Sequence, residues 1–332
     1  MQHDHTWAVV LAGGDGKRLA ALTADDQGRH VPKQFCSLDG ETSLLELALA
    51  RAKSLVPADR VCVVVAKDHE RWWQPLAADL HAGNLVVQPQ NRGTGNGALL
   101  ALSYILKRDP DARLIFLPAD HHALDETPLA HAMASILSSM PAKSKDMFLL
   151  GIAPDDADPD LGYIIPQNVA HHGAHGVRHF IEKPSRGVAG KLIQQGGLWN
   201  SGIFAANGNS LLNLFRKRFP DNVIGFQTAM ARTSSPLPIY PARALIQLYE
   251  RLADVDLSHQ LFQFYVTDLQ VVVVPHCGWS DLGTPQRVSE RVSLLAAQPH
   301  RPPHPRTQTA PLNLADAVSQ AQRQDAPIRA TG

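Results

Sequence analysis

Short apolar runs alternate with amphipathic segments along the first half of the chain. The apolar runs predict strands at 7–12, 60–66, 85–88, 113–117 and 147–152. The segments between them carry apolar residues at helical spacing and predict helices at 43–55, 69–80, 95–107 and 127–139. Strands that alternate with helices indicate an α/β fold built on a doubly wound, mostly parallel, Rossmann-like sheet. In such a sheet, ligands bind at the carboxyl ends of the strands.

The second half has a more mixed pattern, which predicts a smaller α+β portion beside the sheet. Strands are expected at 162–166, 177–182, 202–206 and 269–275. Helices are expected at 187–195, 210–218 and 244–252.

The composition changes near residue 296, where a polar segment with prolines and histidines begins. Such a segment has little apolar surface to offset the entropy that is lost on ordering. We therefore expect one catalytic domain over residues 1–295 and a disordered or loosely attached tail over residues 296–332. The sequence does not decide whether a short helix forms across 312–322.

Composition and charge narrow the class of protein. The chain has 332 residues, 44% of them hydrophobic and 19% charged, with a net charge of +0. This balance excludes a globally basic nucleic-acid surface, so a phosphate site must be a local cluster. No apolar run approaches the roughly 20 residues of a membrane helix, and no secretory signal is evident. The three cysteines form no CxxC pair, so we expect reduced thiols and a cytoplasmic protein.

A glycine-rich loop with basic residues, LAGGDGKRL at 11–19, follows the first expected strand. Glycine has no Cβ to block the approach of a phosphate, and Arg18 offers several donors. A P-loop needs glycine where Leu11 stands and serine or threonine where Arg18 stands, so that motif is excluded. A dinucleotide fingerprint needs glycine in place of Leu19, which disfavours a dehydrogenase.

The loop and several later motifs resemble, in the same order, the sugar-1-phosphate nucleotidyltransferase family. These motifs are PKQ at 32–34, QPQNRGT at 88–94, LPADH at 117–121, GYI at 162–164, FIEKP at 180–184, WNSGIF at 199–204 and GWSDLG at 278–283. The resemblance spans about residues 7–290 and is strongest to the mannose-1-phosphate guanylyltransferase branch. It implies the nucleotidyltransferase (glycosyltransferase-A-like) form of the α/β sheet.

The resemblance also implies roles for individual residues. The residues implied in nucleotide binding are Leu11, Ala12, Gly13, Gly14, Gly16, Gln88, Pro89, Gly93, Thr94 and Asp120. Those implied in sugar binding are Gly162, Tyr163, Glu182 and Asn200. Those implied in catalysis are the cations Arg18, Lys33 and Lys183.

Two aspartates that follow strands, Asp120 and Asp281, are the expected metal ligands. The resemblance implies a reaction in which a sugar 1-phosphate attacks the α-phosphate of a nucleoside triphosphate. Both reactants are anions, so this reaction requires charge neutralisation more than covalent catalysis. Mg²⁺ prefers oxygen ligands and often uses one or two carboxylates together with phosphate and water. Mg²⁺ is therefore the expected cofactor.

The expected substrates are a nucleoside triphosphate, GTP, and a sugar 1-phosphate, mannose 1-phosphate. The run RGTGNG at 92–97 departs from the RNTAPA pattern common in the family, and Ala119 replaces a frequent serine, which leaves the base open. The alternatives are another hexose 1-phosphate such as glucose 1-phosphate, another triphosphate, or an inactive regulator that binds nucleotide sugars. We expect no nucleic-acid or membrane partner. The sequence does not decide whether the protein forms a homo-oligomer.

Overall fold

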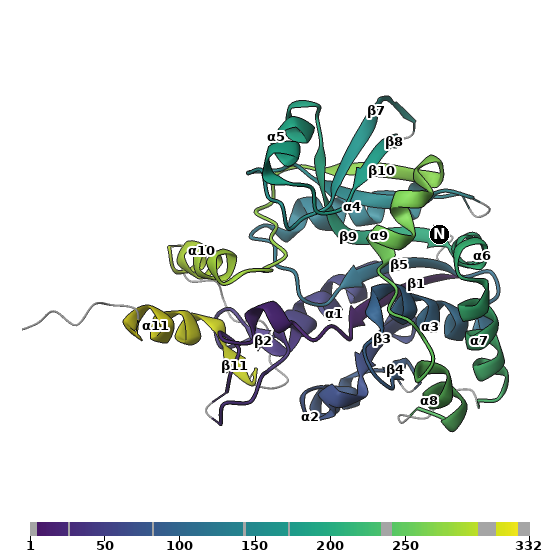
Figure 1. Cartoon of the computed structure of the whole chain (residues 1–332), viewed down its shortest axis with the longest axis horizontal. Helices are drawn as coiled ribbons and strands as arrows, with labels where there is room; N and C mark the ends of the chain where they lie inside the picture. Colours follow the sequence, from purple (N-terminus) through teal and green to yellow (C-terminus); the bar gives the residue numbers. More distant parts are fainter. Residues whose placement is uncertain are drawn as a thin grey trace, which may run out of the picture.

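A nine-stranded mixed sheet forms the centre of the molecule in the computed structural model, with the strand order β4-β3-β1-β5-β9-β6-β10-β8-β7 (Figure 1). The structure describes residues 5–25, 27–81, 83–141, 144–171, 173–233, 241–297 and 310–324. The strands are Thr6–Ala12 (β1), Cys36–Ser37 (β2), Val61–Ala66 (β3), Leu85–Gln88 (β4), Arg113–Pro118 (β5), Met147–Ile152 (β6), Tyr163–His171 (β7), Ala174–Ile181 (β8), Leu198–Asn207 (β9), Leu269–Val274 (β10) and Leu312–Asn313 (β11).

Helices cover both faces of the sheet, as the doubly wound pattern predicts (Figure 1). They are Leu44–Leu55 (α1), Glu70–Trp73 (α2), Gly93–Arg108 (α3), Glu126–Ser139 (α4), Arg186–Gln194 (α5), Gly208–Arg218 (α6), Pro220–Ala231 (α7), Arg243–Tyr249 (α8), Leu257–Gln260 (α9), Pro285–Ala296 (α10) and Leu314–Gln324 (α11). No helix of the described ranges is long and apolar enough to cross a membrane.

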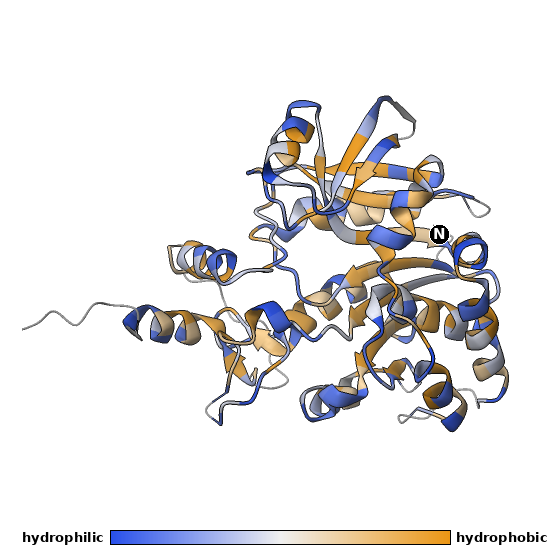
Figure 2. Cartoon of the chain, in the orientation of Figure 1, coloured by the Kyte–Doolittle hydropathy of each residue, from blue (hydrophilic) through white to orange (hydrophobic). Residues whose placement is uncertain are grey.

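Strand β1 is buried on both faces because its side chains alternate between two hydrophobic cores. Ala8 and Val10 belong to the core beneath α1 and α4, whereas Trp7 and Val9 belong to the core beneath α3, α6 and α7. Figure 2 shows the resulting apolar centre of the sheet beneath more polar helix surfaces. A strand covered on both faces is a continuous apolar run, which explains the sequence pattern of 7–12.

The sheet has a parallel half and a mixed half. Strands β4, β3, β1 and β5 are parallel neighbours, which confirms the predicted α/β class. Strand β9 then runs antiparallel between β5 and β6, and β7 and β8 pair as antiparallel neighbours. The candidate site lies where these halves meet, since β9 carries Asn200 and β5 ends just before Asp120.

Part of the expected tail is structured against the domain. Strand β11 pairs in parallel with β2, and α11 packs on α10. Leu314 is fully buried and Val318 is 5% exposed, so these apolar residues attach the segment to the core. The helix that the sequence left open at 312–322 is thus present as α11. The expected boundary at residue 295 stays a prediction, but residues 312–324 are ordered rather than loose.

Candidate functional site

A cavity of about 420 Å³ opens at the carboxyl ends of β1, β4 and β5. Its lining comes from both halves of the sheet and contains most of the residues that the sequence singled out. These are Leu11, Gly13, Gly14, Arg18, Gln88, Gly93, Thr94, Asp120, Gly162, Glu182, Lys183, Asn200 and Asp281. Segments that are more than 250 residues apart in the chain therefore meet around one space.

Some predicted site residues lie outside that lining, namely Ala12, Gly16, Lys33, Pro89 and Tyr163. Gly16 adopts a φ of 64° and precedes the 3₁₀ turn that carries Arg18. Tyr163 is fully buried, and its hydroxyl accepts a hydrogen bond from Trp199 Nε1 at 3.0 Å. The side chain of Tyr163 is thus buried outside the cavity lining, where it bonds to Trp199.

One glutamine side chain, that of Gln34, holds the glycine-rich loop, and a second, that of Gln88, lies close to it. Gln34, which was not expected as a site residue, donates from Nε2 to the carbonyls of Ala12 at 2.8 Å and Gly14 at 2.9 Å. A Cβ built on Gly13 would lie 2.1 Å from Gln88 Nε2, so the loop requires glycine there. The Oε1 atom of Gln88 is buried without a hydrogen-bond partner. An unsatisfied buried acceptor is costly, which points to a donor on a ligand.

Lys33 is buried and joins the two predicted metal ligands. Its side chain is only 6% exposed, and Nζ lies 2.8 Å from Asp120 Oδ2. Nζ also donates to the carbonyl of Asp281 at 2.5 Å. Burial is the strongest influence on Asp120 and disfavours its ionised form, but the Lys33 ammonium, His121 and hydrogen bonds to the carboxylate together outweigh burial and hold the pKa of Asp120 below its ordinary value.

Asp281 occupies a turn with unusual backbone geometry. Its Oδ1 accepts from the Gly283 N–H at 3.0 Å and pairs with Arg287. Burial raises the pKa of Asp281, opposed by Lys33. The next residue, Leu282, has a φ of 49°, a left-handed conformation that costs about 1–3 kcal/mol for residues other than glycine. Such strain typically occurs at functional sites and is maintained by surrounding packing.

Arg18 is an accessible cation in the lining of the cavity. Its side chain is 56% exposed, and the nearest carboxylate, that of Asp160, lies 3.9 Å away. Arg287 behind it pairs with both Asp158 and Asp281. The guanidinium of Arg18 therefore has N–H groups available to donate hydrogen bonds to a bound phosphate. The charge of Arg287 is already neutralised by two carboxylates.

Glu182 is the centre of the residues for which the resemblance implies sugar binding. Its carboxylate is 12% exposed, Oε1 lies 3.3 Å from Lys183 Nζ, and Oε2 is buried without a partner. A Cβ built on Gly162 would lie 2.5 Å from Oε2, so glycine gives the carboxylate its space. Burial raises the pKa of Glu182. Lys183 has a φ of 48°, a second strained residue in the site.

Glu182→Gln is expected to stabilise the unliganded protein at neutral pH. Burial disfavours the ionised carboxylate, so Glu182 lowers the free energy of unfolding as the pH rises through the carboxyl range. Glutamine lacks that charge, and a midpoint increase of about 2–4 °C at pH 7 is expected. The difference should vanish below about pH 3.5, where the glutamate is protonated in both the folded and the unfolded chain.

Thermal unfolding of both proteins across this pH range is the measurement, with the exposed Glu250→Gln as control. An equal midpoint for wild type and Glu182→Gln at pH 7 would show that burial of this charge has no cost.

One wall of the cavity was not predicted from the sequence. Asp256, Leu257 and Ser258, at the start of α9, line it together with Phe262. The Gly95 N–H donates to the carbonyl of Val255 at 2.8 Å, and a Cβ on Gly93 would lie 2.4 Å from the same oxygen. The glycines at 93 and 95, which depart from the family pattern, therefore signal a backbone in close contact.

The acidic residues fit a small divalent cation. Lys33 contacts the carboxylate of Asp120 and the backbone carbonyl of Asp281, and the pKa values of the two aspartates are shifted in opposite directions. The described ranges hold no group of three or more His, Cys, Asp or Glu able to bind a metal. A pair of carboxylates suits Mg²⁺, which keeps several water or phosphate ligands.

Comparison with known proteins places this α/β fold and its cavity in one class. The chain belongs to the nucleotidyl transferase family, whose model matches residues 7–298. Nucleotidyl transferases of this family bind nucleoside triphosphates and sugar 1-phosphates and generally use divalent metal ions.

Individual relatives indicate the branch of the family. The chain is 28% identical over 282 residues to mannose-1-phosphate guanylyltransferase RfbM of Salmonella typhimurium, covering 83% of this chain and 56% of the relative. It is 31% identical over 218 residues to alginate biosynthesis protein AlgA of Pseudomonas fluorescens, covering 64% and 44%. The chain thus spans about half the length of the curated relatives it matches.

A solved structure agrees with this grouping. A Thermus thermophilus protein, described as a mannose-1-phosphate geranyltransferase, superposes with a TM-score of 0.74 at 29% identity. The match covers 90% of this chain and 81% of that protein. The similarity therefore extends over nearly all of the present fold.

Proposed function

We propose that the chain transfers the guanylyl group of GTP to mannose 1-phosphate and releases pyrophosphate, forming GDP-mannose. The observation that carries the proposal is one cavity lined both by an accessible cation, Arg18, and by Glu182, whose Oε2 is buried without a hydrogen-bond partner among the described residues. The first suits a triphosphate and the second suits a sugar hydroxyl. The names of the relatives support guanine and mannose.

The triphosphate binds against the glycine-rich loop, whose N–H groups and Arg18 face the phosphates in this proposal. The buried Oε1 of Gln88 accepts a hydrogen bond from the base edge. Guanine offers N1–H and N2–H donors there, whereas the corresponding ring position of adenine is an acceptor. Gln88 therefore favours guanine at this position.

Asp120 and Asp281 are the residues that would hold Mg²⁺. When bound, the ion supplies charge neutralisation at the phosphates. Lys33 keeps Asp120 ionised through its 2.8 Å contact, so the carboxylate is ready for a cation at neutral pH. These assignments rest on donor chemistry and on the contacts of Lys33, which joins the Asp120 carboxylate to the backbone of Asp281 in the lining of one cavity.

The transfer itself is a substitution at the α-phosphorus. A phosphate oxygen of mannose 1-phosphate forms the new P–O bond, and the bond to the bridging oxygen of the β-phosphate breaks, so pyrophosphate leaves with that oxygen. Lys183 reduces repulsion between the two anions on the sugar side. Arg18 stabilises the charge that develops on the leaving pyrophosphate.

Lys183→Ala is expected to lower kcat/KM for the sugar 1-phosphate by about ten- to a hundredfold, because a charge-assisted contact contributes roughly 1.5–3 kcal/mol. Lys183 is 52% exposed and lies beside Glu182, away from the glycine-rich loop, so the KM for the triphosphate should change little. Steady-state kinetics with each substrate varied in turn separates these effects. Weaker triphosphate binding with unchanged use of the sugar phosphate would mean that the two ends are assigned in reverse.

The proposal is tested by pyrophosphate release from GTP, ATP, UTP and dTTP, each paired with mannose 1-phosphate and glucose 1-phosphate. The highest kcat/KM is expected for GTP with mannose 1-phosphate. A clear preference for another pair would keep the reaction but replace the substrates. No release with any pair would favour a binding regulator without transferase activity.

A further inference from the structure

The wall formed by residues 255–258 borders the cavity. The part of the cavity lined by Glu182, Lys183 and Asn200 is called the sugar half. Ser258 and Asp256 line the same space as Glu182, Lys183 and Asn200. Ser258 is partly exposed to this space. No motif of the sequence marks the wall, and the proposed function has so far given it no role.

The polarity of the hydrogen bonds around Asn200 leaves the Ser258 hydroxyl proton free. The Gly202 N–H can only donate, and it lies 3.2 Å from Asn200 Oδ1, which fixes the orientation of the amide. Nδ2 of Asn200 consequently donates to Ser258 Oγ at 3.2 Å. A hydroxyl that accepts in this way keeps its own proton to donate. Within the described ranges that proton has no hydrogen-bond acceptor.

A complementary acceptor lines the same cavity. Glu182 Oε2 is buried and unpartnered, while Oε1 is engaged by Lys183. The sugar half therefore presents one free donor, on Ser258, and one free acceptor, on Glu182. A hydroxyl oxygen accepts from the first, and a hydroxyl proton is donated to the second. This arrangement matches a polyol, because each of its hydroxyl groups can act in either way.

The wall is held in place independently of any sugar. Leu257 N–H donates to Thr94 Oγ1 at 3.1 Å, and Val255 N–H donates to the carbonyl of Arg92 at 3.1 Å. These bonds attach the wall to the start of α3, where the family resemblance implies that Gly93 and Thr94 bind the nucleotide. A donor on such a preorganised element loses little entropy when it binds.

We propose that Ser258 is a sugar-specificity residue, whose hydroxyl donates to one ring hydroxyl of the hexose 1-phosphate while another ring hydroxyl donates to Glu182. The inference rests on the proposed function for the identity of the ligand. It adds a contact from α9 to those expected from Glu182 and Asn200. The competing role for Ser258 is structural support of the Asn200 amide alone.

Ser258→Ala tests the inference through a panel of monodeoxy mannose 1-phosphates. Titration calorimetry with the full chain is expected to show about five- to tenfold weaker binding of mannose 1-phosphate to the variant, with unchanged GTP binding. One deoxy analogue should bind weakly to wild type but suffer no further loss in Ser258→Ala, because both changes remove the same hydrogen bond. Ser258→Thr keeps the hydroxyl and should retain the discrimination. Ser293→Ala, on α10, is the control.

A variant that weakens every analogue by the same factor would overturn the inference and leave Ser258 as support for Asn200. The readout is binding, so it remains decisive if turnover is absent. Sugar phosphate that binds without turnover refutes the proposed transfer, whereas unchanged discrimination in Ser258→Ala refutes only the specificity role.

Discussion

Replacement of Asp281 by asparagine is expected to lower turnover by about a hundred- to a thousandfold, the range found when one electrostatic contact to the transition state is lost. Asparagine keeps the shape of the side chain and an oxygen for the Gly283 N–H, so the fold should survive. It lacks the negative charge that, with Asp120, makes the site suitable for Mg²⁺.

Turnover as a function of Mg²⁺ concentration is the measurement, with circular dichroism to confirm folding. Asp158→Asn is the matched control, because it also removes a carboxylate from Arg287 but leaves the Asp120 and Asp281 pair intact. The control should keep the Mg²⁺ dependence of wild type. Near-normal turnover of Asp281→Asn at limiting Mg²⁺ would remove this residue from the metal site.

A chain that ends at Ala297 is expected to lose most of its activity and several degrees of thermal stability. Sequence alone predicts the opposite, since no family motif lies beyond residue 290. The structure changes that expectation because the cut removes Leu314, which is fully buried, and β11, which pairs with β2. Loss of a buried leucine alone costs about 2–5 kcal/mol.

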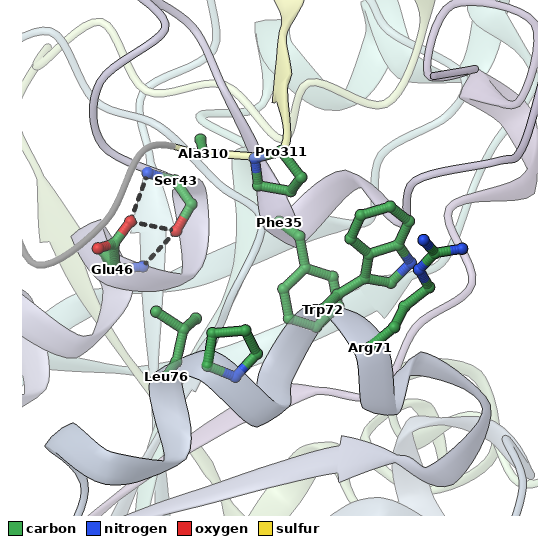
Figure 3. Close-up of a pocket in the computed structure, with 9 residues that line it drawn as sticks. Phe35, Ser43, Glu46, Arg71, Trp72, Leu76, Ala310 and Pro311 are labelled. Carbon is green, nitrogen blue, oxygen red and sulfur yellow. Dashed lines mark hydrogen bonds between the residues drawn. The ribbon is translucent and has the colours of Figure 1, made fainter. Parts of the chain in front are cut away.

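The loss of activity follows from the position of β2 beside the site. Strand β2 directly follows the short turn that carries Lys33 and Phe35. Figure 3 shows Pro311, just before β11, near the ring of Phe35, where both line a cavity of about 170 Å³. Removal of this cover should loosen the turn and displace Lys33 from its position between the two aspartates.

A chain that ends at Gln324 is the control for the truncation, because it keeps β11 and α11 and removes only residues 325–332. It should match wild type in activity and midpoint. Leu314→Asp, in the full-length chain, should reproduce the effect of the long truncation. Full activity in both the long truncation and Leu314→Asp would show that the C-terminal segment does not support the site.

The parallel half of the fold could be predicted because its strands are buried on both faces. Such strands are continuous apolar runs, and β1, β3 and β5 follow the predicted ranges within one residue at each end. The direction of a strand is not encoded in its periodicity, so the antiparallel insertion of β9 between β5 and β6 could not be read from the sequence. The motif at 199–204 lies within that strand.

Helix α10 was missed for a different reason. Its buried face carries Arg291, 6% exposed, beside Val288, so the apolar stripe that would reveal a helix is interrupted. Helix α2 ends early, and a 3₁₀ segment with Pro75 near its start occupies the rest of the predicted 69–80 helix. The tail was expected to be loose because large apolar residues such as Leu312, Leu314 and Val318 are few in a polar segment.

The residues of the site likewise fall into those that could be predicted from the sequence and those that could not. Residues whose chemistry is local, such as Arg18 in its glycine-rich loop, could be found from motifs. Contacts that depend on tertiary structure could not: Gln34 holding the loop, Arg287 paired with Asp281, and Ser258 in the same cavity lining as Glu182. Their side chains are ordinary in sequence, and only the fold brings them to the cavity.

The most direct test of the proposed reaction follows the α-phosphate. The full chain is incubated with Mg²⁺, mannose 1-phosphate and GTP labelled with ³²P at the α-position, and the products are separated. The label should appear in GDP-mannose, with unlabelled pyrophosphate formed in equal amount. Label that appears in GMP, or that stays in GTP under conditions where the protein is folded, would contradict transfer of the guanylyl group to the sugar phosphate.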